Sequence, residues 1–226
     1  MPVPLRRWAP RSIAAIFSLI IAIFVVSGDW SWIQAWIYVI AFEIIQLVNM
    51  AFLRNNPELY EERARPSPDS ARWDKVLSRL VSIGGTFSTI LISAADHRFG
   101  WSSYNSVLSS SIGFIFLLVG GLLGVWALSV NRWFSAVVRI QAERGHRVVR
   151  DGPYRLVRHP SYFGGILFYF GTVLLLDSII GLIPAVLTFV ALVIRAYLED
   201  RFLQENLPGY KDYAREVRQR LIPLIW

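Results

Sequence analysis

The sequence has no cysteine and only three histidines among its 226 residues. The lack of cysteine excludes disulfides, thiolate nucleophiles and cysteine-ligated metal sites. The histidines, His97, His146 and His159, form no HExxH pair or similar ligand spacing, so we expect no metal. No βαβ pattern and no GxGxxG after a strand occur either, which excludes a soluble Rossmann-type cofactor domain.

Charge is scarce as well. Charged residues make up 17% of the chain and hydrophobic residues 54%, with a mean hydropathy of +0.45. A soluble domain has about a quarter of its residues charged. The apolar residues here are clustered into runs that approach the length of about 20 residues needed to cross a bilayer core. We therefore predict an all-α integral membrane protein, a polytopic helical bundle.

Six apolar runs carry this prediction. A signal peptide would resemble the first run, but no convincing cleavage site follows it and further runs do, so we predict a retained helix. The six runs predict about six spans in a single membrane domain, residues 1–226. We divide it into a four-span part, 1–130, and a cofactor-binding catalytic part, 131–226. The runs are residues 12–27, 32–53, 76–95, 107–130, 162–176 and 179–197.

The distribution of basic residues predicts the orientation. The net charge is +7, and Lys and Arg gather at the N-terminus, in the connector 54–75, in the segment 131–161 and in the tail. The loops expected on the other side hold only Arg98. Because cytoplasmic loops carry the excess of Lys and Arg, we expect both termini and the active site to be cytoplasmic, beside membrane lipids and without nucleic acid. We interpret the connector as a mostly solvated loop and His97 as a histidine of an opposite-side loop.

The informative motifs lie in the last third of the chain. One is GHRVVRDGPYRLVRHPSYFGG, residues 145–165, and the other combines Arg195, Glu199 and Asp200 with GYKDY at 209–213. With these motifs the chain resembles the isoprenylcysteine carboxyl methyltransferase and phospholipid methyltransferase group of membrane enzymes. The resemblance covers about the last 95 residues and is vague over the first 130. It implies methyl transfer from S-adenosylmethionine to a lipophilic acceptor, most simply a prenylated carboxylate of the isoprenylcysteine type.

The chemistry of that cofactor selects candidate residues around residue 160. Its carboxylate needs a cationic or N–H-rich partner, which Arg158, His159 and the N–H groups of the next helix start can supply. A helix start is favoured at Pro160. The same two side chains can equally be interfacial charges that anchor a helix end. The remaining cofactor-loop candidates are Tyr162 as a pocket wall, Gly164 and Gly165 as points of close backbone approach, and His146 and Tyr154 beside the GPY turn.

Arg195 and Glu199 are four residues apart, so one helical face carries both. Glu199 can accept from ribose hydroxyls or from the cofactor's amino group, while Arg195 can steer an anionic acceptor. The two can also form a structural ion pair. The family has a pair of glutamates where this chain has Glu199–Asp200, so the cofactor-binding candidate Asp200 has a shorter side chain than the family's acid.

A carboxylate acceptor is already ionised at neutral pH, so no general base is required. The enzyme would then act by alignment and by exclusion of water. An amine or hydroxyl acceptor would need a base, for which Glu199 or His159 are the candidates. Two other hypotheses remain open: a membrane reductase of the sterol reductase type that uses NADPH, and a non-catalytic transporter or scaffold.

Overall fold

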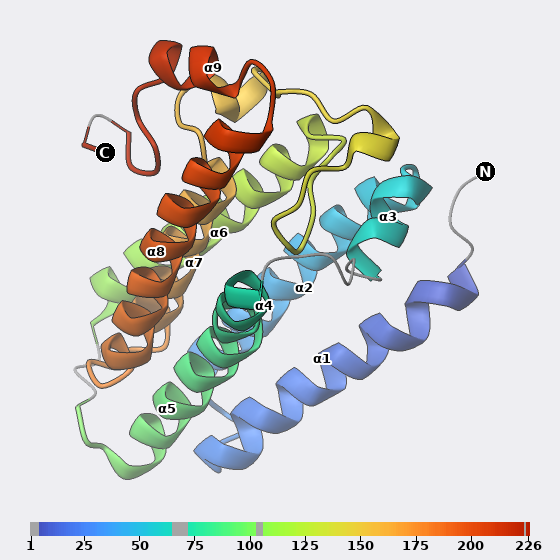
Figure 1. Cartoon of the computed structure of the whole chain (residues 1–226). Helices are drawn as coiled ribbons and strands as arrows, with labels where there is room; N and C mark the ends of the chain where they lie inside the picture. Colours follow the sequence, from blue (N-terminus) through green and yellow to red (C-terminus); the bar gives the residue numbers. More distant parts are fainter. Residues whose placement is uncertain (1–4, 65–71, 103–105, 224) are drawn as a thin grey trace.

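The computed structural model describes residues 5–64, 72–102, 106–223 and 225–226, and its main elements are helices (Figure 1). A π-helical segment, η1 (Leu80–Gly85), joins α4 and α5 into one continuous rod, and two short 3-10 turns follow α6 at Ala142–Arg144 and Gly152–Arg155. The predicted all-α class is confirmed. The helices are α1 (Leu5–Ser27), α2 (Ile33–Arg54), α3 (Pro57–Ala64), α4 (Arg72–Arg79), α5 (Thr86–Phe99), α6 (Val107–Val130), α7 (Pro160–Leu175), α8 (Leu182–Asn206) and α9 (Tyr210–Glu216).

Four helices in the described part of the chain are long and apolar enough to cross a membrane. They make this a multi-pass membrane protein. The apolar part of α1, Ile16–Ser27, and the 16-residue α7 are shorter than these four. The prediction of six spans requires both shorter helices to cross as well, and it stays a prediction. The four long helices are Ile33–Arg54, Trp73–Phe99, Val107–Val130 and Leu182–Asn206.

The outer faces of the bundle are apolar. On α8 the side chains of Ile183, Leu187, Val190 and Ile194 are all exposed, and they recur about once per turn. Residues at this spacing form a stripe along one side of a helix. Such a stripe would be an aggregation hazard in water, whereas lipid is its natural solvent.

Glycines allow α6 and α7 to touch along their backbones. A Cβ added at Gly120 would lie 2.4 Å from the carbonyl oxygen of Gly164, and one at Gly113 would lie 2.3 Å from the amide nitrogen of Leu175. No atom lies within 4 Å of a Cβ added at Gly124. In lipid, helices associate through such close packing because the hydrophobic effect between them is absent. The position of α7 is therefore fixed against α6.

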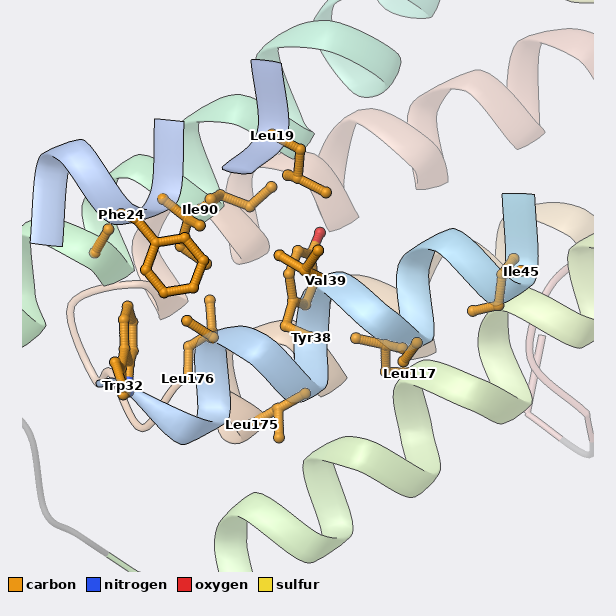
Figure 2. Packing of buried hydrophobic residues seen from close by; sticks show 14 residues of the cluster. Leu19, Phe24, Trp32, Tyr38, Val39, Ile45, Ile90, Leu117, Leu175 and Leu176 are labelled. Atoms are coloured by element: carbon orange, nitrogen blue, oxygen red, sulfur yellow. The ribbon is translucent and has the colours of Figure 1, made fainter. Parts of the chain in front are cut away.

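A cluster of buried hydrophobic side chains also holds the helices together (Figure 2). Phe24 of α1, Tyr38 of α2, Ile90 of α5, Leu117 of α6 and Leu175 of α7 are each at most 1% exposed. Dispersion contacts among large side chains are individually weak but add up in a close-packed interior. Five helices thus share one core.

Polar side chains close the end of the bundle at which α5 meets α6 and α7 turns into α8 (Figure 1). Asp96 accepts hydrogen bonds from Ser102 Oγ at 2.5 Å and from Ser178 Oγ at 2.6 Å. His97 Nε2 lies 3.0 Å from Asp29 Oδ2. The interpretation of His97 as a loop residue is wrong, because 96–99 form the last turn of α5, where hydrogen bonds and an ion pair satisfy these polar groups. Figure 1 shows α3, the end of α6 and α9 at the opposite end.

Three boundaries differ from those expected. The connector 54–75 contains α3 and the start of α4, while its residues 65–71 lie outside the described part. The last long helix begins at Leu182 and not at residue 179, and it continues to Asn206 instead of ending near Tyr197. Glu199 and Asp200 are therefore helical residues in the penultimate turns of α8.

Candidate active site

A cavity of about 390 Å³ lies where the segment after α6 meets the start of α7 and the end of α8. Side chains of α3, α4, η1 and α9 complete its wall. The sequence predicted that the polar segment 131–161 and the acidic end of the last span come together, and the structure brings them together. Of the predicted site residues, those that line the cavity are His146, Tyr154, Arg158, His159, Tyr162, Arg195 and Glu199.

Asp200 is a fully buried hub beneath this wall. It accepts hydrogen bonds from Arg158 Nε at 2.7 Å, Arg220 Nε at 3.0 Å, Tyr210 OH at 3.0 Å and Gln204 Nε2 at 2.8 Å. One carboxylate therefore holds together the start of α7, α8, α9 and the tail. Asp200 does not line the cavity, so its position is that of a structural anchor for the side chains that do.

The donors of Arg158 are used up by the protein. Its Nε and Nη2 bond Asp200, and its Nη1 donates to the carbonyl oxygens of Val217 at 2.6 Å and Arg218 at 3.0 Å. Its backbone N–H donates to Gln219 O and that of His159 donates to Arg220 O, each at 3.0 Å. The tail therefore supplies partners for these donors, and the assignment of Arg158 and His159 to the carboxylate of a cofactor stays a prediction.

Glu199 presents its carboxylate to the cavity. The Tyr162 hydroxyl donates a hydrogen bond to Glu199 Oε2, and the Tyr162 ring stacks on the His159 ring with centroids 5.5 Å apart. His159 Nδ1 lies 4.0 Å from Glu199 Oε1. Its buried Nε2 lies 3.6 Å from Asp200 Oδ1 and has no hydrogen-bond partner in the described part of the chain. Tyr162 thus fixes the orientation of the acid.

Arg195 pairs with Asp74 and not with Glu199. Its Nε donates to Asp74 Oδ1 at 2.8 Å and its Nη2 donates to Ala136 O at 2.8 Å. The other oxygen of Asp74 accepts from Val138 N–H at 2.6 Å. The possible Arg195–Glu199 ion pair is therefore absent from the structure. Asp74 was not among the residues predicted from the sequence. An acidic residue at the edge of an apolar run is costly to place in a membrane, so its position indicates that it has a partner.

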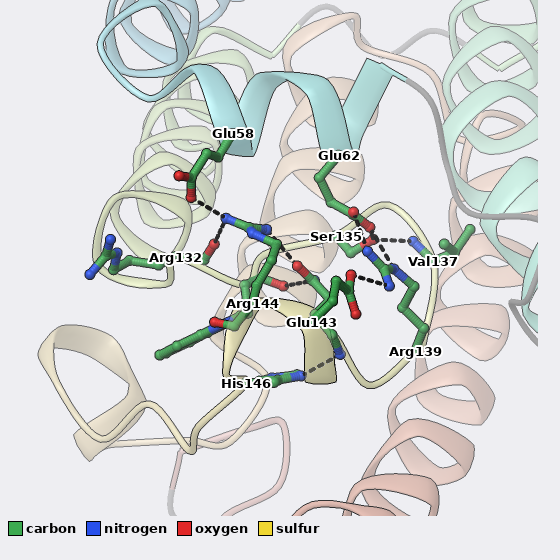
Figure 3. Close-up of polar contacts among 11 residues, drawn as sticks. Glu58, Glu62, Arg132, Ser135, Val137, Arg139, Glu143, Arg144 and His146 are labelled. Atoms are coloured by element: carbon green, nitrogen blue, oxygen red, sulfur yellow. Dashed lines mark hydrogen bonds and ion pairs between the residues drawn. The ribbon is translucent and has the colours of Figure 1, made fainter.

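The short helix α3 holds the segment after α6 in place (Figure 3). Glu62 accepts hydrogen bonds from Ser135 Oγ at 2.8 Å and from Arg139 Nε at 3.0 Å, and Arg139 Nη1 also bonds Glu143 at 2.8 Å. The Arg139 guanidinium lowers the pKa of Glu62. The interpretation of residues 54–75 as a mostly solvated loop is therefore wrong for this part, whose acids are partners of the cavity wall.

His146 and Tyr154 form an aromatic part of the wall. The His146 ring stacks on Trp133 with centroids 5.5 Å apart, and its Nδ1 accepts from the Gln141 N–H at 3.3 Å. Burial, reinforced by nearby arginines, lowers the pKa of His146, so the ring is neutral at pH 7. Tyr154 OH accepts from Asn131 Nδ2 at 3.1 Å.

Gly164 and Pro160 do not line the cavity. A Cβ added at Gly164 would lie 2.5 Å from Gly120 O, so the glycine serves the contact between α6 and α7. Gly165 is the glycine that lines the cavity. The expectation that a ligand approaches the backbone at Gly164 is wrong, because α6 covers that side of the helix. Pro160 is the first residue of α7, as predicted.

Comparison with known proteins finds a similarity to one protein family. Residues 108–208 match the model of the family described as phospholipid methyltransferase. This part of the chain, a little under half of it, is similar to the phospholipid methyltransferase family. Arg158, His159, Tyr162, Arg195 and Glu199 fall inside the matched range, whereas α3, Asp74 and α9 fall outside it.

Several curated relatives are similar over about half of the chain. Protein-S-isoprenylcysteine O-methyltransferase A of Arabidopsis thaliana is 32% identical over 111 residues, which is 48% of this chain and 56% of the relative. The enzyme of the same name from Schizosaccharomyces pombe is 31% identical over 125 residues, 52% of this chain and 50% of the relative. The cobalt-zinc-cadmium resistance protein CzcN of Cupriavidus metallidurans is 33% identical over 124 residues, 54% of each chain. The chain therefore spans about half the length of the curated relatives it matches.

Proposed function

We propose that this protein is a membrane-embedded methyltransferase that moves the methyl group of S-adenosylmethionine to a lipophilic acceptor, most simply a carboxylate of the isoprenylcysteine type. The observation that carries the proposal is the cavity itself. It combines an oriented carboxylate, Glu199, with aromatic walls, and it lies at the polar end of an apolar bundle. Similarity to a methyltransferase family and to relatives named as O-methyltransferases supports the same reaction class.

The residues present fit the proposed cofactor. Glu199 can accept from its ammonium group or ribose hydroxyls, and His159 Nε2 is a buried polar atom that still lacks a hydrogen-bond partner in the described chain. Tyr210 also lines the cavity, and aromatic rings attract cationic groups. When bound, the cofactor would supply an electrophilic methyl group. Arg158 lines the cavity, and its ion pair with the buried Asp200 fixes the start of α7 against α8.

The acceptor needs little chemical help from the chain. A carboxylate is ionised at neutral pH and can attack a methyl group without a general base. The residues must align the two reactants and exclude water. Tyr162 holds Glu199, and Asp74 holds both Arg195 and the backbone at Val138. We propose that Arg195 contributes to acceptor orientation from this fixed position.

The apolar part of the wall supports a lipophilic acceptor. Val81 of η1, Gly165 and Tyr169 of α7, and Leu192 of α8 all line the cavity. Tyr169 OH donates to the backbone oxygen of Val81 at 2.7 Å, a tie between α7 and the π-helical segment. π-Helical turns inside α-helices are frequent at functional sites. We propose that the lipid-like part of the acceptor packs against this wall.

A labelling experiment tests the proposal. The purified protein is incubated with S-adenosylmethionine labelled in its methyl group and with prenylcysteines, phospholipids and small lipophilic amines or alcohols. We expect the label to move to a prenylcysteine carboxylate. Equilibrium binding of S-adenosylmethionine and of NADPH is measured in parallel. Binding of NADPH alone would overturn the proposal in favour of a reductase.

A further inference from the structure

Arg63 of α3 differs from the other arginines of the cavity wall. Arg139, Arg158 and Arg195 each bond a carboxylate of the protein. Arg63 is half-buried and lines the cavity, and its guanidinium carbon lies 5.2 Å from the ring centroid of Phe134. Among the described residues it has no ion pair and no hydrogen bond, so in this part of the chain its donors lack an acceptor.

A half-buried cation without a carboxylate or hydrogen-bond partner in the described chain is unfavourable. Burying a charge is costly unless it is paired and hydrogen-bonded, and burial lowers the pKa of Arg63. Arg147 is another wall arginine for which the described chain offers no carboxylate, but it is exposed and water solvates it. Stacking on Phe134 leaves the edge of the Arg63 guanidinium available. A planar guanidinium matches the two oxygens of a carboxylate.

The neighbourhood of Arg63 connects it to the rest of the site. Phe134, beneath its guanidinium, is two residues before Ala136, whose carbonyl oxygen accepts from Ser78 Oγ at 2.6 Å and from Arg195 Nη2 at 2.8 Å. Glu62, its neighbour in α3, is bound to Arg139. α3 is therefore held rigidly against the segment after α6, and Arg63 is presented from a fixed support.

We propose that Arg63 binds the anionic group of the methyl acceptor, a carboxylate in the simplest case. This inference rests on the proposed function. The cofactor also has a carboxylate, but α3 lies outside the family-matched residues 108–208. A contact to the cofactor is expected within the shared region, whereas a contact that selects the acceptor can lie outside it. One acceptor oxygen can face Arg63 while the other attacks the methyl group.

Binding measurements on Arg63→Gln and Arg63→Lys test this assignment. The probes are N-acetyl-S-farnesylcysteine, its uncharged carboxamide of nearly the same shape, and S-adenosylmethionine. Arg54→Gln is the matched control, since Arg54 is an exposed arginine at the end of α2 that does not line the cavity. Thermal unfolding of each variant shows whether the fold is retained.

We expect the wild type and Arg54→Gln to bind the carboxylate about tenfold or more tightly than the carboxamide, the effect of one charge-assisted contact. Arg63→Gln should lose this preference, Arg63→Lys should keep part of it, and both should bind S-adenosylmethionine as the wild type does. A preference that survives in Arg63→Gln would overturn the assignment, and so would a parallel loss of S-adenosylmethionine affinity. A wild type that binds no S-adenosylmethionine would instead overturn the proposed function.

Discussion

At the scale of single residues, the adjacent acids Glu199 and Asp200 have different surroundings. Successive residues on a helix point about 100° apart, so Glu199 faces the cavity while Asp200 faces the buried arginines Arg158 and Arg220. The sequence identified both acids as candidates but treated them as one cofactor-binding pair. Their division into a ligand-facing acid and a structural acid depends on the tail, whose path no local pattern predicts.

Substitution separates these two roles. We expect Glu199→Gln to abolish S-adenosylmethionine binding with little change in melting temperature, and His159→Ala to abolish it in a protein that still folds. Asp200→Asn should instead destabilise the fold by about 3–5 kcal/mol, because two buried or half-buried arginines lose their counter-ion. Isothermal titration calorimetry and thermal unfolding in detergent measure the two effects. Wild-type affinity in Glu199→Gln would contradict the site assignment.

His146 predicts a pH dependence. Burial holds the pKa of His146 below its ordinary value of 6.5, with Arg139 and Arg144 acting in the same direction and Glu143 and Glu199 opposing them. The folded protein therefore binds fewer protons than the unfolded chain below pH 6.5, so stability is lost as the pH falls through this value. The slope from one group is at most about 1.4 kcal/mol per pH unit.

The measurement is thermal unfolding of the wild type and of His146→Phe between pH 7.5 and 5.5. The phenylalanine preserves a ring against Trp133 but does not titrate. We expect the loss of stability on acidification to be smaller in the variant. Identical pH profiles for the two proteins would show that His146 is not the titrating group.

At the scale of elements, the contact between α6 and α7 decides where the site begins. Glycines at 113 and 120 of α6 face 164 and 171 of α7, and the backbones meet along the whole contact. Small residues four apart, as at Gly120 and Gly124, permit a close helix contact, and α7 makes this contact at Gly120. The partner helix was not predictable, because small residues permit a close approach without specifying which helix makes it.

Two alanine substitutions on α6 form a matched pair. In Gly120→Ala the new Cβ would meet the α7 backbone at 2.4 Å, so we expect a loss of about 1–3 kcal/mol and weaker S-adenosylmethionine binding. In Gly124→Ala the new Cβ meets no atom within 4 Å, so stability should be unchanged or slightly higher, since alanine favours helix. Thermal unfolding compares them, and equal stabilities would argue against the close contact.

At the scale of the whole molecule, the cavity is closed by segments far apart in sequence. Glu62 and Arg139 are 77 residues apart, and Asp74 and Arg195 are 121 apart. Glu62 and Asp74 belong to the connector 54–75, which the sequence predicted to be a mostly solvated loop. The structure makes this connector part of the cavity wall, which couples the N-terminal helices to residues 131–226.

The orientation of the protein in the membrane, with both termini and the site on the cytoplasmic side, is a prediction about the whole molecule. The chain has no cysteine, so single-cysteine variants report sidedness without background. Arg155 and Trp101 lie at opposite ends of the bundle. The side chain of Arg155 is 72% exposed, and Trp101 as a whole residue is 57% exposed. We expect a membrane-impermeant maleimide to label Trp101→Cys in intact cells and Arg155→Cys only in inverted vesicles. The reverse pattern would contradict a cytoplasmic active site.

Hydropathy and helix-start signals act over neighbouring residues, so they were enough to predict the helical class, the four long apolar helices and the two motifs that meet at the cavity. The partners of the charged groups are visible only in the folded protein. Arg158 is bound to Asp200, Arg195 to Asp74 and Arg139 to Glu62, while Arg63 is left to face the cavity. Which charges pair inside the protein, and which remain for a ligand, depends on three-dimensional proximity, and sequence distance carries no information about it.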